Sequence, residues 1–365
     1  MKIVIATPLY PPEIGGPATY AQLLMEHLPQ RGIEAELVTF SSVRHLPKGL
    51  RHLAYFWRVY IAARRAAAVL ALDPVSVGVP ALGAAKLRGA KFIVRIAGDY
   101  AWEQGRQRFG VTEELDAFVG RPQPSFFVRL FQRIQTFVAR AAAQIIVPSE
   151  YLKRIVAAWG LRPEQIRVIY NAVSVGSPGA VPAVISKSKG KIVLTAGRLV
   201  PWKGIDGLID AVSSMRAAHP NLLLVIAGDG PQRQVLEKRA EEKLKIGYVF
   251  TGALPHAELI AVLRLATVFV LNSSYEGLSH LLIEAVMLGV PIVATDIPGN
   301  VEVIAHEKNG LLVPPKDSHQ LASAINRLLS DGVLRARFKK QNEEQAKRFS
   351  EERMIESVVN LLTAL

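Results

Sequence analysis

Arg198 and Lys203 are the two residues of this sequence whose types and spacing point most directly to chemistry on an anion. They lie five residues apart in a loop that runs from Gly197 to Gly204, directly after a short apolar run. A guanidinium offers a planar fork of donors and an ammonium offers a point charge, so the pair suits a diphosphate. The alternative is that both are ordinary solvated loop charges. We expect Arg198 and Lys203 to bind a diphosphate.

Two glutamates, Glu276 and Glu284, have seven residues between them at the predicted start of a helix. An apolar run ends at Leu271, Glu276 lies in the loop after it, and the helix begins near Gly277–Ser279. The exposed N–H groups and the positive dipole end of a helix suit a phosphate. Glu284 falls about two turns into a helix that is otherwise nearly all apolar. A carboxylate inside a buried helix is costly without a partner, and a ligand hydroxyl would be one. The alternative for Glu284 is a surface position.

Gly15 and Gly16 follow the first apolar run and precede a helix-patterned segment. Glycines at such a junction let the backbone approach a ligand and direct N–H groups at an anion, although a tight turn would also explain them. Their spacing is not the G-x-G-x-x-G of dinucleotide-binding folds, which disfavours an NAD enzyme. The chain has no cysteine. No cluster of His, Asp and Glu has metal-ligand spacing, so we expect neither a metal nor a cofactor.

Short β-branched runs alternate with longer helix-patterned segments along the whole chain. The runs are apolar with little alternation, as in parallel strands that helices cover on both faces. The first series comprises Lys2–Ala6, Glu36–Phe40, Val75–Val79, Lys91–Ile96, Gln144–Val147 and Arg167–Ile169. The second comprises Lys191–Thr195, Leu222–Ala227, Tyr248–Phe250, Val268–Leu271, Pro291–Ala294 and Leu311–Val313. Two such series predict an α/β fold with two doubly wound domains, whose ligands bind at the carboxyl ends of the strands.

The 365 residues suffice for two domains. A stretch rich in Ser, Gly, Pro and Ala, residues 174–190, has the composition of a linker. We therefore place one domain at residues 1–173 and a second at 191–344. Residues 333–365 have a helical pattern, and we expect 345–365 to form a helix that packs back toward the first domain.

The sequence resembles the retaining glycosyltransferases of family 4 in four segments and in their order. These segments are Gly15-Gly16, the Gly197-Arg198…Lys203-Gly204 loop, Ala227-Gly228-Asp229-Gly230 and the Glu276–Glu284 pair. The likeness covers nearly the whole chain. It implies the GT-B fold, in which two Rossmann-like domains face a central cleft. It also implies a metal-independent enzyme of the hexosyltransferase type that moves a sugar from a nucleotide-sugar to an acceptor hydroxyl. We favour a UDP-sugar over a GDP- or ADP-sugar, and a glycan or lipid-linked acceptor such as one of the cell envelope.

The resemblance implies a role for individual residues. Arg198 and Lys203 would neutralise the donor diphosphate, Glu284 would hold the ribose hydroxyls, and Glu276 would lie beside the transferred sugar. The remaining residues implied at the donor are Gly15, Gly16, Gly197, Gly228, Leu254, Gly277, Leu278 and Ser279.

Asp99 departs from the family's pattern, because many relatives have a histidine there that contacts the donor sugar. We expect Asp99 to take that catalytic place by accepting a hydrogen bond from a sugar hydroxyl. The alternative is that it caps a helix, a common role of aspartate.

The net charge of +13 is uneven, with 22 Lys and Arg against 12 Asp and Glu in residues 1–170. Residues 44–65 and 122–140 mix arginines with aromatics. The first interpretation is amphipathic helices that cover the sheet. The alternative is a surface that rests on anionic lipid. No nucleic-acid-binding module is recognisable.

Residues 66–85 are apolar but are interrupted by Asp73 and Pro74, so we expect no membrane-spanning helix. We expect a cytoplasmic protein. If the basic segments rest on anionic lipid, the protein would be peripheral on the inner face of the membrane. Two other functions fit the same residues. One is a nucleotide-sugar epimerase or another GT-B enzyme, and the other is a non-catalytic scaffold that binds sugar or lipid.

Overall fold

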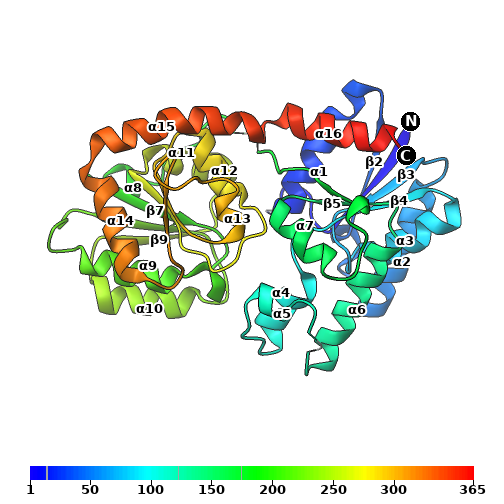
Figure 1. Ribbon diagram of the computed structural model, residues 1–365, viewed down its shortest axis with the longest axis horizontal. Helices are drawn as coiled ribbons and strands as arrows, with labels where there is room; N and C mark the ends of the chain where they lie inside the picture. Colours follow the sequence, from blue (N-terminus) through cyan, green and yellow to red (C-terminus); the bar gives the residue numbers. More distant parts are fainter. Residues whose placement is uncertain (14, 122, 174) are drawn as a thin grey trace. The chain divides into compact units, whose positions relative to one another are not determined.

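The structure, a computed structural model, describes residues 1–13, 15–121, 123–173 and 175–365. Ile14, Pro122 and Ser174, which belong to the predicted glycine loop, basic segment and linker, lie outside the described residues. The chain forms two compact units, one of Met1–Ala172 with Glu351–Leu365 and one of Val173–Ser350. Each is a parallel sheet with helices packed against it (Figure 1).

The first unit has a six-stranded sheet in the order β2-β1-β3-β4-β5-β6. All neighbouring strands run parallel. The strands are β1 (Lys2–Thr7), β2 (Glu34–Thr39), β3 (Ala68–Ala71), β4 (Lys91–Arg95), β5 (Gln144–Val147) and β6 (Ile166–Val168). The helices are α1 (Gly16–His27), α2 (Lys48–Ala62), α3 (Gly78–Arg88), α4 (Tyr100–Arg108), α5 (Leu115–Phe118), α6 (Phe126–Arg140) and α7 (Glu150–Ala157). Short 3₁₀ turns lie at Pro29–Arg31, Ser41–Val43 and Pro163–Gln165.

The second unit repeats the architecture in the order β12-β11-β10-β7-β8-β9, again with all neighbours parallel. Its strands are β7 (Ile192–Ala196), β8 (Leu223–Ala227), β9 (Tyr248–Gly252), β10 (Val268–Leu271), β11 (Ile292–Thr295) and β12 (Leu311–Val313). Its helices are α8 (Ala183–Ser186), α9 (Ile205–Ser214), α10 (Arg233–Leu244), α11 (His256–Leu265), α12 (His280–Met287), α13 (Pro298–Val301), α14 (Ser318–Ser330) and α15 (Gly332–Ala346). Two 3₁₀ turns, Pro201–Lys203 and Lys347–Phe349, complete it. The prediction of two doubly wound α/β sheets is confirmed.

The predicted strand at Val75–Val79 is wrong. The third strand is β3, and Val75–Val79 forms a turn and the start of α3. Asp73 fixes this turn, because its Oδ1 accepts hydrogen bonds at 2.8 Å from the N–H of Val75 and from the hydroxyl of Ser76. The alanine-rich composition of Ala68–Ala71 favours a helix. Pairing with β1 and β4 and complete burial override that preference.

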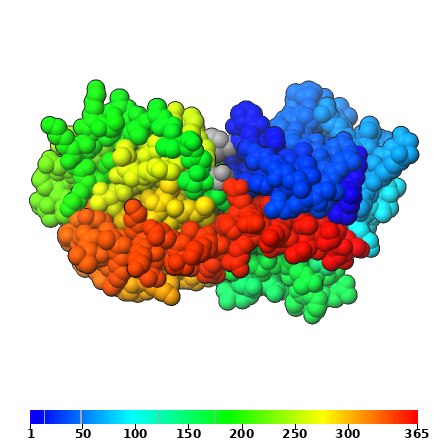
Figure 2. Space-filling view, turned by 90° about the horizontal axis from the view of Figure 1, so that it is seen from above, coloured from blue at the N-terminus to red at the C-terminus, as the bar shows by residue number. Residues whose placement is uncertain are grey.

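The C-terminal stretch with a helical pattern, residues 333–365, forms two helices. α15 ends in the second unit, the chain passes through Lys347–Phe349, and α16 (Glu351–Thr363) joins the first unit. Figure 2 shows α16, in red, against the blue first residues of the chain. Met354, Ile355 and the other apolar residues of its inner face share one core with α1 and β1. Burying that face ties the end of the chain to its beginning.

No described helix combines the length and the apolar character that crossing a lipid bilayer requires.

The core position of Ile355 predicts a large loss of stability when its side chain is shortened. Ile355 has no exposed surface, so Ile355→Ala is expected to lower the free energy of unfolding of the first unit by about 2–5 kcal/mol. Urea unfolding followed by tryptophan fluorescence measures this, since three of the four tryptophans (Trp57, Trp102 and Trp159) lie in that unit. Glu356→Ala, on the exposed face of the same helix, is the control. Equal midpoints for the two variants would contradict this packing.

Candidate functional site

The loops after β7 and β10 meet because these strands are neighbours in the second sheet. The side-chain amide of Asn272 donates to the carbonyl of Gly204 at 2.7 Å, and the N–H of Ser274 donates to the carbonyl of Trp202 at 2.8 Å. Gly204 has a φ of 59°, and a Cβ there would lie 2.3 Å from the carbonyl oxygen of Asn272. Only glycine permits this approach, which brings Lys203 and Glu276 to one place.

Lys203 and Glu276 form an ion pair between these two loops. Lys203 Nζ lies 2.5 Å from Glu276 Oε1, and the Ser273 hydroxyl donates to the same oxygen at 2.6 Å. The two charged side chains are only 16% and 11% exposed, so the pair is largely removed from water. In such surroundings the attraction is stronger than on an open surface. The sequence indicated Lys203 and Glu276 separately, but it did not indicate that they pair or that Ser273 holds the carboxylate.

The loop after β8 completes this edge of the sheet. The N–H of Leu199 donates to the carbonyl of Asp229 at 2.9 Å. A Cβ on Gly228 would lie 1.9 Å from the carbonyl oxygen of Gly197, so the two backbones touch directly. The requirement for glycine at position 228 is therefore a packing requirement between loops. Arg198 follows Gly197 in the loop after β7, and its side chain is exposed.

Helix α12 begins as predicted, with Ser279 as its cap. The Ser279 hydroxyl accepts a hydrogen bond from the N–H of Leu282 at 3.3 Å. Gly277, Leu278 and Ser279 are all buried and directly follow Glu276 in the sequence. Their loop lies at the amino end of the helix, where its dipole favours an anion.

Glu284 is 5% exposed in the second turn of α12, which confirms that it lies within a buried helix. Its Oε1 lies 3.0 Å from Nε2 of His256. Its Oε2 is also buried, and no described protein group donates to it. A buried carboxylate oxygen without a hydrogen bond is energetically costly, so a hydrogen-bond donor to this atom would be stabilising.

His256, like Ser273, is a residue of the site that the sequence analysis did not identify. It opens α11, two residues after Leu254, which is half-buried in the loop that follows β9. The hydrogen bond to Glu284 raises the pKa of His256 above its usual 6.5, against the opposing effect of partial burial. In the sheet order, β9 and β10 are separated by β7 and β8. No local pattern could have predicted this contact.

Gly15 and Gly16 lie at the start of α1 in the first unit, as the sequence predicted. Gly15 precedes the first helical residue, Gly16, with a φ of 155°. A Cβ on Gly15 would lie 2.9 Å from a side-chain carbon of Leu9. That carbon is the flexible end of a side chain and can move, so it is the φ of Gly15, which residues with a Cβ rarely adopt, that favours glycine at this junction.

Asp99 caps α4 and is 1% exposed. Its Oδ1 accepts a hydrogen bond from the N–H of Trp102 at 2.9 Å. Burial raises the pKa of Asp99, while hydrogen bonds from Trp102, Gln135 and Trp159 oppose that rise. These contacts match the alternative role as a helix cap. The predicted contact between Asp99 and a sugar hydroxyl stays a prediction.

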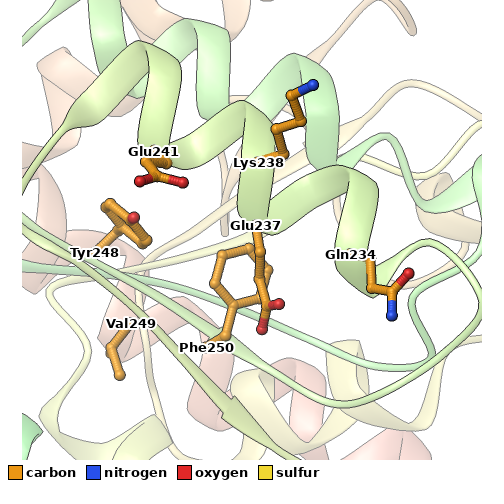
Figure 3. A pocket seen from close by; sticks show the side chains of 7 residues that line it. All are labelled: Gln234, Glu237, Lys238, Glu241, Tyr248, Val249 and Phe250. Atoms are coloured by element: carbon orange, nitrogen blue, oxygen red, sulfur yellow. The ribbon is translucent and has the colours of Figure 1, made fainter.

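A hollow of about 560 Å³ lies elsewhere in the second unit, between α10 and the edge strand β9 (Figure 3). Its walls include Glu237 and Glu241 beside Tyr248 and Phe250. Two carboxylates disfavour a diphosphate, so this hollow does not share the chemistry of the Lys203–Glu276 cluster. Among the residues that the structure describes, no three His, Asp or Glu side chains are grouped as metal ligands.

Two doubly wound parallel sheets, with cationic and acidic side chains gathered at the carboxyl edge of the second, define the GT-B fold. Solved structures agree over the whole chain. The Anabaena protein HepE in complex with UDP-glucose has a TM-score of 0.77 at 21% identity and covers 100% of both chains. Sucrose-phosphate synthase of Thermosynechococcus elongatus has a TM-score of 0.79 at 20% identity, covering 100% of this chain and 98% of that one. At these identities the likeness shows the fold.

Two family models match consecutive parts of the sequence. The model described as Glycosyltransferase Family 4 matches residues 14–176, and the model described as Glycosyl transferases group 1 matches residues 182–345. The chain belongs to the family 4 glycosyltransferases.

Curated relatives match over part of their length. An uncharacterized glycosyltransferase of Methanocaldococcus jannaschii is 33% identical over 202 residues, which are 52% of this chain and 52% of that protein. The alpha-D-kanosaminyltransferase of Streptomyces kanamyceticus is 35% identical over 147 residues, 40% of this chain and 38% of that enzyme. The chain thus spans about half the length, or less, of these relatives.

The His256–Glu284 contact predicts a histidine that titrates above 6.5. A raised pKa in the folded state means that the pair stabilises the fold at acidic pH and that this contribution is lost as the pH rises through the pKa of folded His256. The proton NMR titration of His256 is expected to have its midpoint above 6.5, and Glu284→Gln should bring it back toward 6.5. His256→Gln assigns the resonance. An unchanged midpoint in Glu284→Gln would show that the pair does not form in solution.

Proposed function

We propose that this chain is a retaining, metal-independent glycosyltransferase that moves a sugar from a nucleotide diphosphate to an acceptor hydroxyl. The observation that carries the proposal is the half-satisfied carboxylate of Glu284. His256 engages one of its oxygens, and the other is buried without a donor. A ribose hydroxyl would supply that donor and remove the cost of the unpaired oxygen. Glu284 is therefore our candidate for the residue that anchors the nucleotide.

The diphosphate fits the cations of the adjoining loops. Lys203 lies within an ion pair that is largely shielded from water, and Arg198 lies exposed on the same loop. The N–H groups of Gly277–Ser279, at the start of α12, add partial positive charge. In this proposal Arg198 and Lys203 stabilise the negative charge that develops on the departing nucleotide.

Glu276 would lie beside the transferred sugar, held in orientation by Lys203 and Ser273. The bond between the anomeric carbon and the phosphate oxygen breaks while the acceptor oxygen bonds to the same carbon on the same face. The departing phosphate oxygen accepts the acceptor's proton, so that no second carboxylate is required as a base. Glu276 then acts by stabilising positive charge on the sugar and by orienting it.

The donor that we favour is a UDP-sugar, and the solved relative HepE binds UDP-glucose in its crystal structure. Leu254, in the loop after β9, would contact the base through its main chain, and Gly15 and Gly16 would approach the phosphates from the first unit. The acceptor would be a glycan or a lipid-linked glycan of the cell envelope, used at the cytoplasmic side of a membrane.

Removing the Glu284 carboxylate is expected to weaken nucleotide binding strongly. A hydrogen bond to a charged group contributes about 1.5–3 kcal/mol, so Glu284→Ala should raise the Kd of UDP by roughly 10- to 100-fold. Titration calorimetry measures this. Glu241→Ala, an exposed carboxylate on α10, is the matched control and should bind as the wild type does. A loss confined to Glu284→Ala supports the anchor, whereas equal Kd values for both variants contradict it.

Arg198→Ala is expected to slow transfer more than it weakens binding, because its interaction strengthens as the leaving group gains charge. The loss in kcat should be on the order of 10²–10³.

UDP-, GDP- and ADP-sugars are first screened by thermal shift, and turnover of the wild type and of Arg198→Ala is then measured with a crude lipid extract as acceptor. Release of an isomerised sugar without acceptor would indicate an epimerase instead. If no nucleotide-sugar raises the Tm of the wild type, the donor site is wrongly assigned.

A further inference from the structure

Helices α2, α3 and α6 of the first unit contain no Asp or Glu, although each carries Lys or Arg. The basic residues with described side chains are Arg51, Arg58, Lys86, Arg88, Arg129, Arg133 and Arg140. By contrast, α10 of the second unit mixes acidic and basic residues along its length. Since a merely solvated helix usually carries both signs, three neighbouring helices of one sign favour an anionic partner.

The same three helices expose large apolar side chains. On α2, Leu50, Leu53, Trp57 and Ile61 recur at intervals of three and four residues, which forms one stripe along the helix. The apolar surface continues onto α3 with Leu87 and onto α6 with Phe126, Phe127, Leu130 and Phe137. Together with the four side chains of α2, these nine side chains are between 38% and 69% exposed. An apolar surface of this extent on otherwise basic helices is typical of an interaction site.

Contacts between the helices join these side chains into one surface, which we term the α2–α3–α6 surface. The guanidinium of Arg88 on α3 lies 3.6 Å from the ring centre of Tyr60 on α2, and its Nε donates to the Tyr60 carbonyl at 2.9 Å. Lys86 Nζ, also on α3, lies 6.0 Å from the ring centre of Phe137 on α6. Figure 1 shows the three helices next to one another.

A hollow of about 370 Å³ lies on this surface, along α6. It is lined by Arg129, Arg133 and Arg140 together with Phe137, Gln132 and Thr136. Three guanidiniums around one hollow suit a phosphate group, because a guanidinium can donate two hydrogen bonds to it. Arg129 also donates through Nη1 to the carbonyls of Gln123 and Pro124, which holds it at the end of the hollow. The aromatic ring in the same wall would contact the apolar part of the bound molecule.

We propose that the α2–α3–α6 surface docks the protein on a bilayer that contains anionic phospholipids, with the hollow on α6 receiving a headgroup phosphate. The exposed leucines, Ile61 and the aromatic residues would enter the boundary between headgroups and acyl chains, and the arginines would lie at the phosphates. Aliphatic side chains such as Leu53 and Ile61 have no comparable role against a nucleic-acid backbone, which is why lipid is the occupant we favour over RNA or DNA.

Vesicle flotation tests the docking surface directly. Wild-type protein is mixed with phosphatidylcholine vesicles that contain 30% phosphatidylglycerol, or none, in the absence of any nucleotide-sugar. We expect flotation with the anionic vesicles and much less with the neutral ones, and release as salt is raised, because salt screens the attraction. Equal flotation with both vesicles, or flotation with neither, would overturn the proposal.

Two matched pairs of variants locate the surface. Arg58→Glu with Arg133→Glu should weaken vesicle binding by more than about tenfold. Lys238→Glu with Lys340→Glu changes the net charge equally on exposed positions of the second unit and should bind as the wild type does. Trp57→Ser with Phe137→Ser should also lose binding. Ile246→Ser with Val333→Ser, at positions of the second unit that are even more exposed, should not. If a double variant of the first unit and its control in the second unit lost vesicle binding equally, the lipid contact would lie elsewhere.

Tryptophan emission gives a second readout that does not depend on flotation. Trp57 is 52% exposed, so its emission should shift to the blue on anionic vesicles, and the shift should disappear in Trp57→Phe. An oligonucleotide that binds more tightly than the vesicles, or displaces the protein from them, would overturn lipid as the occupant. Because no nucleotide-sugar is present, the outcome is independent of the proposed transferase activity.

Discussion

Close approach of the loop backbones at the carboxyl edge of the second sheet is the constraint on which the candidate site depends. Gly204 rests against the carbonyl of Asn272, and Gly228 rests against that of Gly197, at distances that leave no room for a Cβ. These contacts join the loops after β7, β8 and β10 into one rim. Lys203 and Glu276 are 73 residues apart in the chain, and these backbone contacts are what bring Lys203 Nζ to 2.5 Å from Glu276 Oε1.

The chemistry of the rim follows from how its carboxylates are satisfied. Glu276 is held by an ammonium and a hydroxyl, so its orientation is fixed before any ligand binds. Glu284 is held on one side only, by His256, and its second oxygen is buried without a donor. Two glutamates of the same helix region thus have different local surroundings, and this difference supports different tasks for them.

The first unit distributes its side chains in another way. The inner face of α16 joins α1 and β1 in a well-packed core, whereas α2, α3 and α6 leave aromatic and aliphatic side chains exposed among arginines. Side chains that serve only the stability of the fold would be buried, as large apolar side chains usually are. Their exposure, with one sign of charge around them, is the reason that we assign this surface to a partner rather than to the fold.

The sequence by itself determined the two β/α series, the loops with Arg198 and Lys203, and the burial of Glu284, because periodicity, glycine placement and the cost of an isolated carboxylate are local properties. It misplaced the third strand, since alanine-rich Ala68–Ala71 is recognisable as a strand only once β1 and β4 pair with it. The tertiary structure alone decided that Ser273 and Lys203 hold Glu276, that His256 contacts Glu284, and that Asp99 caps α4. The two contacts to Lys203 and His256 join segments far apart in the chain, and their formation depends on strand order, which no local pattern encodes.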